Sequence, residues 1–228
     1  MDYLYATIIG YLCGSIPTAY WLGLAVYRLN IFEHGSRNMG ATNVYRVLGK
    51  VPFAFTLAID VLKGMMAIII TARFIEKSPA ALFVAGGAAL AGHTLSFWVK
   101  FRGGKGVASG LGVFMALAPK ATLSALIIFV ITLVASTYVS LGSILASAAL
   151  PFLIYYFQEG GSDYYQYMTA FSAIVAIFII YKHKANIQRI AKGEELGLGS
   201  KKGPDKTSDP TDLPTEEELK PSSDGEVK

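Results

Sequence analysis

Long apolar stretches dominate this sequence and limit it to folds that cross a lipid bilayer. A transmembrane helix needs about 20 mainly apolar residues, and four stretches supply them: residues 3–27, 51–74, 80–99 and 164–181. The apolar content of 53% and the mean hydropathy of +0.46 exceed those of ordinary soluble domains. The first residues lack the basic segment of a signal peptide, so we expect the first stretch to be retained as a span.

Basic residues indicate how these spans are oriented. Lysine and arginine concentrate in residues 28–50, 100–105 and 182–192, and the positive-inside rule places all three segments in the cytoplasm. The N-terminus and the acidic turn at residues 159–163 then face outward.

Residues 107–157 are too long for one span and must cross the membrane an odd number of times. Breaks near residues 118–120 and 140–143 favour three shorter helices there. We therefore predict an all-α integral membrane fold: a seven-helix bundle with short broken helices, its N-terminus outside and its C-terminus in the cytoplasm. Five spans is the alternative.

The charge balance changes near the C-terminus. Residues 1–199 contain 15 basic and 8 acidic residues, whereas residues 200–228 contain 5 basic and 8 acidic residues and almost nothing apolar. Such a composition cannot bury enough surface to fold. We expect a membrane-embedded domain over residues 1–196 and a disordered cytoplasmic tail over residues 197–228.

A glycine-rich segment is the first candidate site. Gly103, Gly104, Lys105 and Gly106 precede an apolar run that can begin a helix at Val107. Glycines let the backbone approach a ligand closely, and a helix N-terminus offers amide donors, so the segment is suited to binding a phosphate. It is not a nucleotide P-loop, because that motif needs a hydroxyl directly after the lysine. The alternative is a flexible loop at the membrane edge whose lysine contacts lipid head groups.

The first cytoplasmic segment is the second candidate site. Small, hydroxyl and amide residues crowd together here, and Arg46 could bind an oxyanion through two hydrogen bonds. The alternative is an ordinary polar loop. The expected phosphate contacts in this segment are Gly35, Ser36, Asn38, Gly40, Asn43 and Arg46.

Charged and polar residues inside the apolar stretches form a third group. Asp60 and Lys63 are three residues apart on one helical face, and we expect a structural ion pair that orients Lys63 and Gly64 near the site, because unpaired charges are costly there. His93 is expected to be a hydrogen-bonded packing histidine. Ser143 either donates to a ligand or belongs to a helix break.

A basic segment follows the last span. Read as a helix, it places His183, Asn186, Ile187 and Ile190 on one face and Lys184, Gln188 and Lys192 on another. We expect the first face to meet the site. The alternative is an interfacial helix that only binds anionic lipid.

Four of these segments together resemble the bacterial acyl-phosphate:glycerol-3-phosphate acyltransferases, the PlsY family. The resemblance spans about residues 4–196 and rests on residues 35–46, 60–64, 92–107 and 183–194. Ser96 stands where the family pattern has proline. The resemblance implies an inner-membrane enzyme with its active site at the cytoplasmic face, which carries out the first acylation step of bacterial phospholipid synthesis. It would transfer a fatty acyl group from acyl phosphate to the 1-hydroxyl of glycerol 3-phosphate, giving lysophosphatidic acid and phosphate.

The resemblance implies no metal, cofactor or acyl-CoA. Membrane lipid is an expected partner, nucleic acid is not, and the enzyme that makes acyl phosphate is a further candidate. The expected catalytic residues are Ser36, Arg46, Lys105, Ser143, His183 and Asn186. The expected phosphate-binding residues are Gly35, Ser36, Asn38, Gly40, Asn43, Arg46, Gly103, Gly104, Lys105, Gly106 and Asn186, with Asp60, Lys63, His93 and Glu194 in support.

Other classes of protein fit the sequence less well. No histidine is followed five residues later by aspartate, and the G-x-S-x-G nucleophile motif is absent. Cys13, the one cysteine, lies within the first span, which argues against a catalytic thiolate. A transporter or flippase for a phosphorylated solute or lipid is the alternative, although we find no convincing internal repeat. A non-catalytic lipid-binding scaffold is a third hypothesis.

Overall fold

The computed structural model describes residues 1–75, 77–158 and 164–199, and the secondary structure of these residues is helical. Among these residues, six segments are long and apolar enough to cross a membrane, and α6 (Val107–Leu117) is apolar but shorter. The predicted all-α membrane fold is confirmed. The helices are α1 (Asp2–Ser15), α2 (Thr18–Tyr27), α3 (Ala41–Leu48), α4 (Lys50–Phe74), α5 (Pro79–Thr94), the 3-10 helix η1 (Phe97–Val99), α6 (Val107–Leu117), α7 (Pro119–Ser136), α8 (Val139–Phe157), α9 (Tyr164–Lys182) and α10 (Lys184–Ala191).

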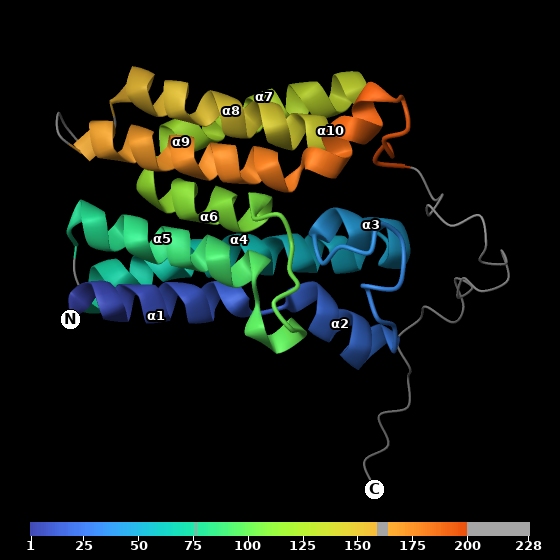
Figure 1. Cartoon of the computed structure of the whole chain (residues 1–228), viewed down its shortest axis with the longest axis horizontal. Helices are drawn as coiled ribbons and strands as arrows, with labels where there is room; N and C mark the ends of the chain where they lie inside the picture. Colours follow the sequence, from blue (N-terminus) through green and yellow to red (C-terminus); the bar gives the residue numbers. More distant parts are fainter. Residues whose placement is uncertain (76, 159–163, 200–228) are drawn as a thin grey trace, which may run out of the picture.

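The helices form two groups with α6 between them (Figure 1). One group contains α1, α4 and α5, and the other contains α7, α8 and α9. Small residues let α1 and α5 pack closely, because a Cβ atom at Gly14 would lie 1.9 Å from the backbone oxygen of Ala89. Helices α2, α3 and α10 gather with residues 100–106 at one end of the bundle, which we call the loop end. The N-terminus lies at the other end (Figure 1).

The first span is broken at Ile16 and Pro17, as the proline predicts. Helix α1 ends at Ser15 and α2 begins at Thr18. The Ile16 carbonyl lies in this break, where it accepts from the Thr18 amide over 3.1 Å and from Lys63 Nζ over 2.9 Å. The buried lysine of α4 thus caps the end of α1.

One of the two predicted breaks between residues 107 and 157 lies elsewhere in the structure. The break expected at residues 140–143 lies instead at Thr137 and Tyr138, where Thr137 adopts a left-handed backbone conformation. Ser143 lies within α8, and its Oγ donates to the carbonyl of Val139 one turn earlier. The break predicted near Pro119 is confirmed, since α6 ends at Leu117 and α7 begins at Pro119.

The first connecting segment is also more regular than predicted. Residues 41–48, read as loop from the sequence, form α3. Helix α10 begins at Lys184, as expected, with His183 and Asn186 buried; Ile187, however, is 41% exposed, so its predicted place on the inward face is wrong. The acidic turn at residues 159–163 and residues 200–228 of the predicted tail lie outside the described residues.

Candidate active site

A cavity of about 800 Å³ opens at the loop end and extends between the helices. Its loop-end portion is lined by polar residues of α3, α8 and α10 and by the glycine segment. Its remaining walls are apolar and come from α6, α7, α8 and α9: Leu111, Phe114, Leu126, Phe129, Leu150 and Val175. The cavity can therefore hold a molecule that is polar at one end and apolar at the other.

The first segment is folded around the side chain of Asn43, which is 1% exposed. Its Oδ1 accepts from the Ser36 amide at 2.6 Å, and its Nδ2 donates to the carbonyls of Ile31 and His34. Asn38 Oδ1 accepts from the Gly40 amide at the start of α3. Asn43 is thus occupied in shaping the segment, while Ser36, Asn38 and Gly40 line the cavity.

Arg46 projects from α3 into the cavity with donors to spare. One terminal nitrogen donates to the carbonyl of Leu196 at 3.0 Å. The Nε atom is buried and has no hydrogen-bond partner in the described part of the chain. A buried guanidinium nitrogen without an acceptor is costly, so this position favours an anionic ligand.

The glycine segment brings Lys105 to the same end of the cavity. Gly106 is the N-cap of α6, and Gly106, Val107 and Ala108 line the wall. Lys105 Nζ donates to Asn186 Oδ1 over 2.5 Å. A lysine, the first turn of a helix and the amide side chain of α10 therefore meet at one point.

Glu195 organises the neighbouring side chains. Its Oε1 accepts from Ser140 at 2.7 Å and from Asn186 at 2.6 Å, and its Oε2 accepts from Arg189 Nε at 2.7 Å. Burial alone would raise the pKa of Glu195, but the hydrogen bonds from Asn186, Ser140 and Arg189 hold it below its ordinary value. Glu195 is thus ionised and fixes Asn186 in place.

A turn after α10 brings Glu195 back toward the helix. Gly193 has φ +69°, its amide donates to the carbonyl of Ile190, and the Glu194 amide donates to that of Arg189. This pair of bonds is the Schellman motif, which needs a left-handed residue at the position of Gly193. The chain therefore reverses after α10, and the Glu195 carboxylate meets that helix.

The loop end of the cavity carries an excess of positive charge. Four cationic side chains line it: Arg46, Lys105, Lys182 and Arg189. Burial first, and then the neighbouring cations Arg189, Arg46 and Lys182, lower the pKa of Lys105 to about 8, although Glu195 opposes this. Of the acidic groups nearby, Asp60 is paired with Lys63 and Glu194 is exposed. The arrangement is suited to binding more than one negative charge.

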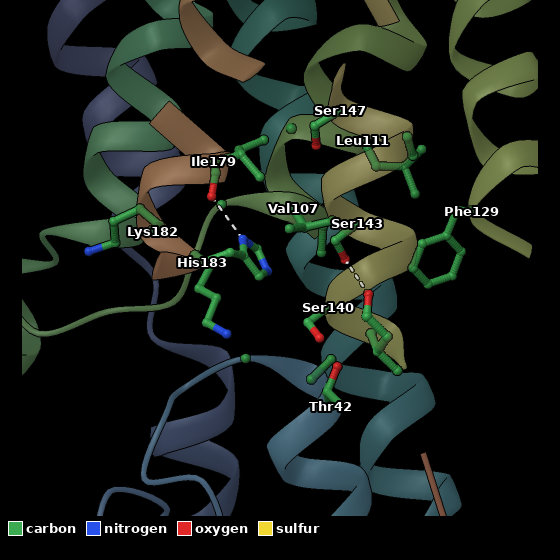
Figure 2. A pocket seen from close by; sticks show the side chains of 18 of the residues that line it. Thr42, Val107, Leu111, Phe129, Ser140, Ser143, Ser147, Ile179, Lys182 and His183 are labelled. Atoms are coloured by element: carbon green, nitrogen blue, oxygen red, sulfur yellow. Dashed lines mark hydrogen bonds between the residues drawn. The ribbon is translucent and has the colours of Figure 1, made fainter. Parts of the chain in front are cut away.

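His183 and Ser143 lie on facing walls of the cavity, with Thr42 and Ser140 beside them (Figure 2). His183 Nδ1 lies 2.8 Å from the carbonyl of Ile179, so this nitrogen must carry the proton. Burial, and then the charge of Lys105, lower the pKa of His183 to about 4. The ring is therefore neutral near pH 7, and its Nε2 is an acceptor. Lys182 points away from this pair (Figure 2).

The predicted ion pair in α4 is present behind the cavity. Lys63 Nζ lies 2.7 Å from Asp60 Oδ1, and both side chains are buried. The same carboxylate oxygen accepts from Thr18 at 3.2 Å and lies 4.0 Å from His93 Nδ1. Asp60 and His93 both reach the cavity wall.

The structure brings most of the predicted residues together, although they come from segments far apart in sequence. All six predicted catalytic residues line the one cavity, as do Asn38, Gly40, Asn43, Gly106, Asp60, His93 and Glu194. Four others do not line it: Gly35, Lys63, Gly103 and Gly104. Sequence reasoning did not assign Ser140, Arg189 or Glu195 to the site. The glycine after Lys192 was the available signal, because Gly at a helix end indicates a turn.

Known proteins resemble the chain over nearly all of this region. The family model described as glycerol-3-phosphate acyltransferase matches residues 4–193. Proteins named glycerol-3-phosphate acyltransferase from Desulforamulus reducens and Geotalea daltonii are 40% and 44% identical to this chain over 196 and 189 residues. These matches cover 86% and 82% of this chain and 95% and 94% of the relatives.

Two crystal structures share the fold. Both are of PlsY (YgiH), described as an integral membrane glycerol 3-phosphate acyltransferase. Its lysophosphatidic acid form has a TM-score of 0.77 at 29% identity and covers 86% of this chain and 95% of that one. Its glycerol 3-phosphate form has a TM-score of 0.76 at 30% identity and covers 87% and 96%.

Proposed function

This chain belongs to the glycerol-3-phosphate acyltransferase family, and we propose that it transfers a fatty acyl group from acyl phosphate to the 1-hydroxyl of glycerol 3-phosphate. The products would be lysophosphatidic acid and inorganic phosphate. The observation that carries this proposal is the two-part cavity, whose cationic end and apolar walls match a phosphate and an alkyl chain. Both proposed substrates carry phosphate, and one carries the chain.

The cationic end would hold the two phosphates. Arg46 offers its unpartnered Nε, Lys105 offers the ammonium that now meets Asn186, and Ser36 adds a hydroxyl beside the start of α3. The crystal structure of the relative in its glycerol 3-phosphate form supports glycerol 3-phosphate as the acceptor. The apolar walls of α6 to α9 would hold the acyl chain.

The chemistry requires no covalent intermediate on the protein. Acyl phosphate is a mixed anhydride, so the 1-oxygen of glycerol 3-phosphate forms a bond to the acyl carbon while the bond from that carbon to phosphate oxygen breaks. The leaving phosphate takes the bonding electrons, and the hydroxyl proton passes to a substrate phosphate, whose second pKa is about 6. Lys105 and Arg46 stabilise the charge that develops.

His183 and Ser143 have different parts in this scheme. Because Nδ1 of His183 donates to Ile179, Nε2 of the neutral ring is an acceptor, so the ring can accept a hydrogen bond from bound substrate but cannot donate to an oxyanion. Ser143 is then the donor for the acyl oxygen, since its hydroxyl can rotate from the carbonyl of Val139 toward the cavity.

Replacing His183 with glutamine should leave measurable activity and leave the acid limb of the pH–rate profile near pH 6. The pKa of His183 is about 4. A limb near pH 6 therefore belongs to substrate phosphate, whose second pKa is about 6. The measurement is kcat/KM between about pH 3.5 and about pH 8, a range that covers both groups. Complete loss of activity that imidazole restores would make His183 the general base.

The alkaline limb should report Lys105. Its pKa is about 8 in the free protein, so the side chain is a charged ammonium below that pH and a neutral amine above it. We therefore expect kcat/KM to fall above about pH 8, and kcat to fall at higher pH because a bound phosphate raises the pKa of the lysine. Lys105→Arg should move the kcat/KM limb upward, since arginine stays protonated. An unmoved limb would assign it to another group.

Removal of residues 200–228 should change kcat and KM by no more than about twofold. The described residues that line the cavity end at Leu198, whose amide donates to the carbonyl of Thr137. Kinetics of the truncated protein, compared with the full chain at equal membrane content, check this. A larger loss of activity would show that residues 200–228 contribute to catalysis or substrate binding.

We place the enzyme in the bacterial inner membrane with the loop end at the cytoplasmic face. The runner-up function, a transporter, would need a compartment to show activity. Purified protein in detergent, given acyl phosphate and glycerol 3-phosphate, should form lysophosphatidic acid. It should form none from acyl-CoA, and absence of product from acyl phosphate would refute the proposal.

A further inference from the structure

The glycine segment lies directly on the ring of His93. A Cβ atom built on Gly104 would be 2.2 Å from His93 Nε2, a separation that real atoms do not reach. The Gly104 amide also donates to the carbonyl of His93 at 3.2 Å. His93 is 2% exposed, so the ring has little room to move aside. The path of the segment is therefore set by contact with this ring.

The other side of the ring meets the buried ion pair of α4. His93 Nδ1 lies 4.0 Å from Asp60 Oδ1, which is too long for a hydrogen bond, and it has no hydrogen-bond partner among the described residues. Asp60 is itself fixed by Lys63 and Thr18, and Lys63 is fixed by the carbonyl of Ile16. Packing against a rigid charged group, rather than a direct bond, thus holds the ring in position.

Lys105 follows the residue that touches the ring. Its Nζ meets Asn186 at 2.5 Å, and Glu195 in turn fixes Asn186. A shift of the backbone at Gly104 would carry Lys105 away from this partner. A displacement of about 1 Å can cost a factor of 10² in rate.

We propose that His93 is a positioning residue, which is wedged between the Asp60–Lys63 pair and Gly104 and so holds Lys105 at the cationic end of the cavity. This inference rests on the proposed role of Lys105 in binding substrate phosphate. It revises the sequence expectation for the ion pair, which acts here on the glycine segment through His93 rather than on Gly64.

A double-mutant cycle tests this contact directly. Gly104→Ala alone should lower kcat by about 10² because its methyl group meets the ring, and His93→Ala alone should lower kcat by about tenfold or more. If the ring is what excludes a side chain at position 104, the kcat of the double variant should be no lower than that of the more impaired single variant. Losses that multiply would overturn the proposal.

Gly103 supplies a matched control. A Cβ atom there would lie 2.1 Å from the backbone oxygen of His93 and 2.7 Å from the backbone carbon of Thr94, which no side-chain truncation removes. His93→Ala should therefore fail to rescue Gly103→Ala. Equal rescue at both positions would show general loosening of the fold and would also overturn the proposal. If His93→Ala does not insert, His93→Gln serves in the same cycle, because its flexible end can yield to the new methyl group.

A second measurement does not depend on turnover. The fraction of Lys105 that reacts with acetic anhydride, measured by mass spectrometry across pH, reports how readily its ammonium loses a proton. The charged groups facing it are Glu195, Arg189, Arg46 and Lys182, with the neutral ring of His183 nearby. Burial is what chiefly lowers the pKa of Lys105. If Lys105 leaves its buried position in His93→Ala, the midpoint pH of labelling should rise by about one unit or more.

An unchanged midpoint in His93→Ala would contradict the positioning role even if the enzyme were active. Conversely, a raised midpoint in a protein that forms no lysophosphatidic acid would support the positioning role and refute the proposed reaction. Thr71→Val, which alters a buried hydroxyl of α4 away from the cavity wall, should leave the midpoint unchanged.

Discussion

Lys105→Ala should lower kcat for acyl transfer by about 10² to 10³ while the protein still inserts into the membrane. Lys105 is the cation at the start of α6, and its charge would lie beside the leaving phosphate in the transition state. Removing one group that stabilises a developing oxyanion has effects of this size. Steady-state rates with acyl phosphate and glycerol 3-phosphate, normalised to the amount of folded protein, give the comparison.

Lys100→Ala is the matched control, because Lys100 is an exposed lysine five residues earlier that does not line the cavity. Its rates should stay near those of the unaltered protein. Lys105→Arg should recover part of the lost rate, since the charge remains but the guanidinium fork is larger. Near-normal turnover of Lys105→Ala would show that Lys105 takes no part in the reaction.

Glu195→Ala should lower kcat/KM by about 10² or more. The carboxylate accepts from Asn186, Ser140 and Arg189 together, so its loss frees three donors at once. Arg189 is 40% exposed and its ion pair is screened by solvent, so the larger effect should come through Asn186, the partner of Lys105. Kinetics and thermal unfolding of the same preparation separate a lost site from a lost fold.

Glu194→Ala is the natural comparison, because it removes a carboxylate from the same turn but from an exposed position. Its effect should be far smaller. Glu195→Gln should fall between the two, since the amide keeps one acceptor oxygen but cannot accept from Arg189. Equal losses at positions 194 and 195 would mean that net charge, and not the hydrogen bonds, controls the site.

The spans were predictable because length and hydropathy determine them. Pro119 marks a helix start by its missing donor, and the break there was found where it was expected. The break at Thr137 was not, because a threonine in the left-handed region has no sequence signature. The serines that follow were misread as the break, whereas Ser143 is absorbed into α8 by bonding to Val139.

The candidate site was predictable in its residue types but not in its connections. Asn43 looks like a ligand from sequence, yet its side chain is occupied by the backbone of its own segment. Glu195 was passed over in favour of Glu194, because only the turn at Gly193 decides which carboxylate meets Asn186. Ile187 fits the inward face by spacing, but the two-turn helix α10 leaves it exposed.

The central claim is direct transfer of the acyl group from acyl phosphate to glycerol 3-phosphate within this cavity. A single-turnover reaction tests it, with purified protein in excess over acyl phosphate that carries a radiolabelled chain. After an acid quench, we expect the label to pass from acyl phosphate to lysophosphatidic acid with one rate constant and without label on the protein. Label bound covalently to the protein when glycerol 3-phosphate is omitted, or no labelled lysophosphatidic acid when it is present, would contradict the account.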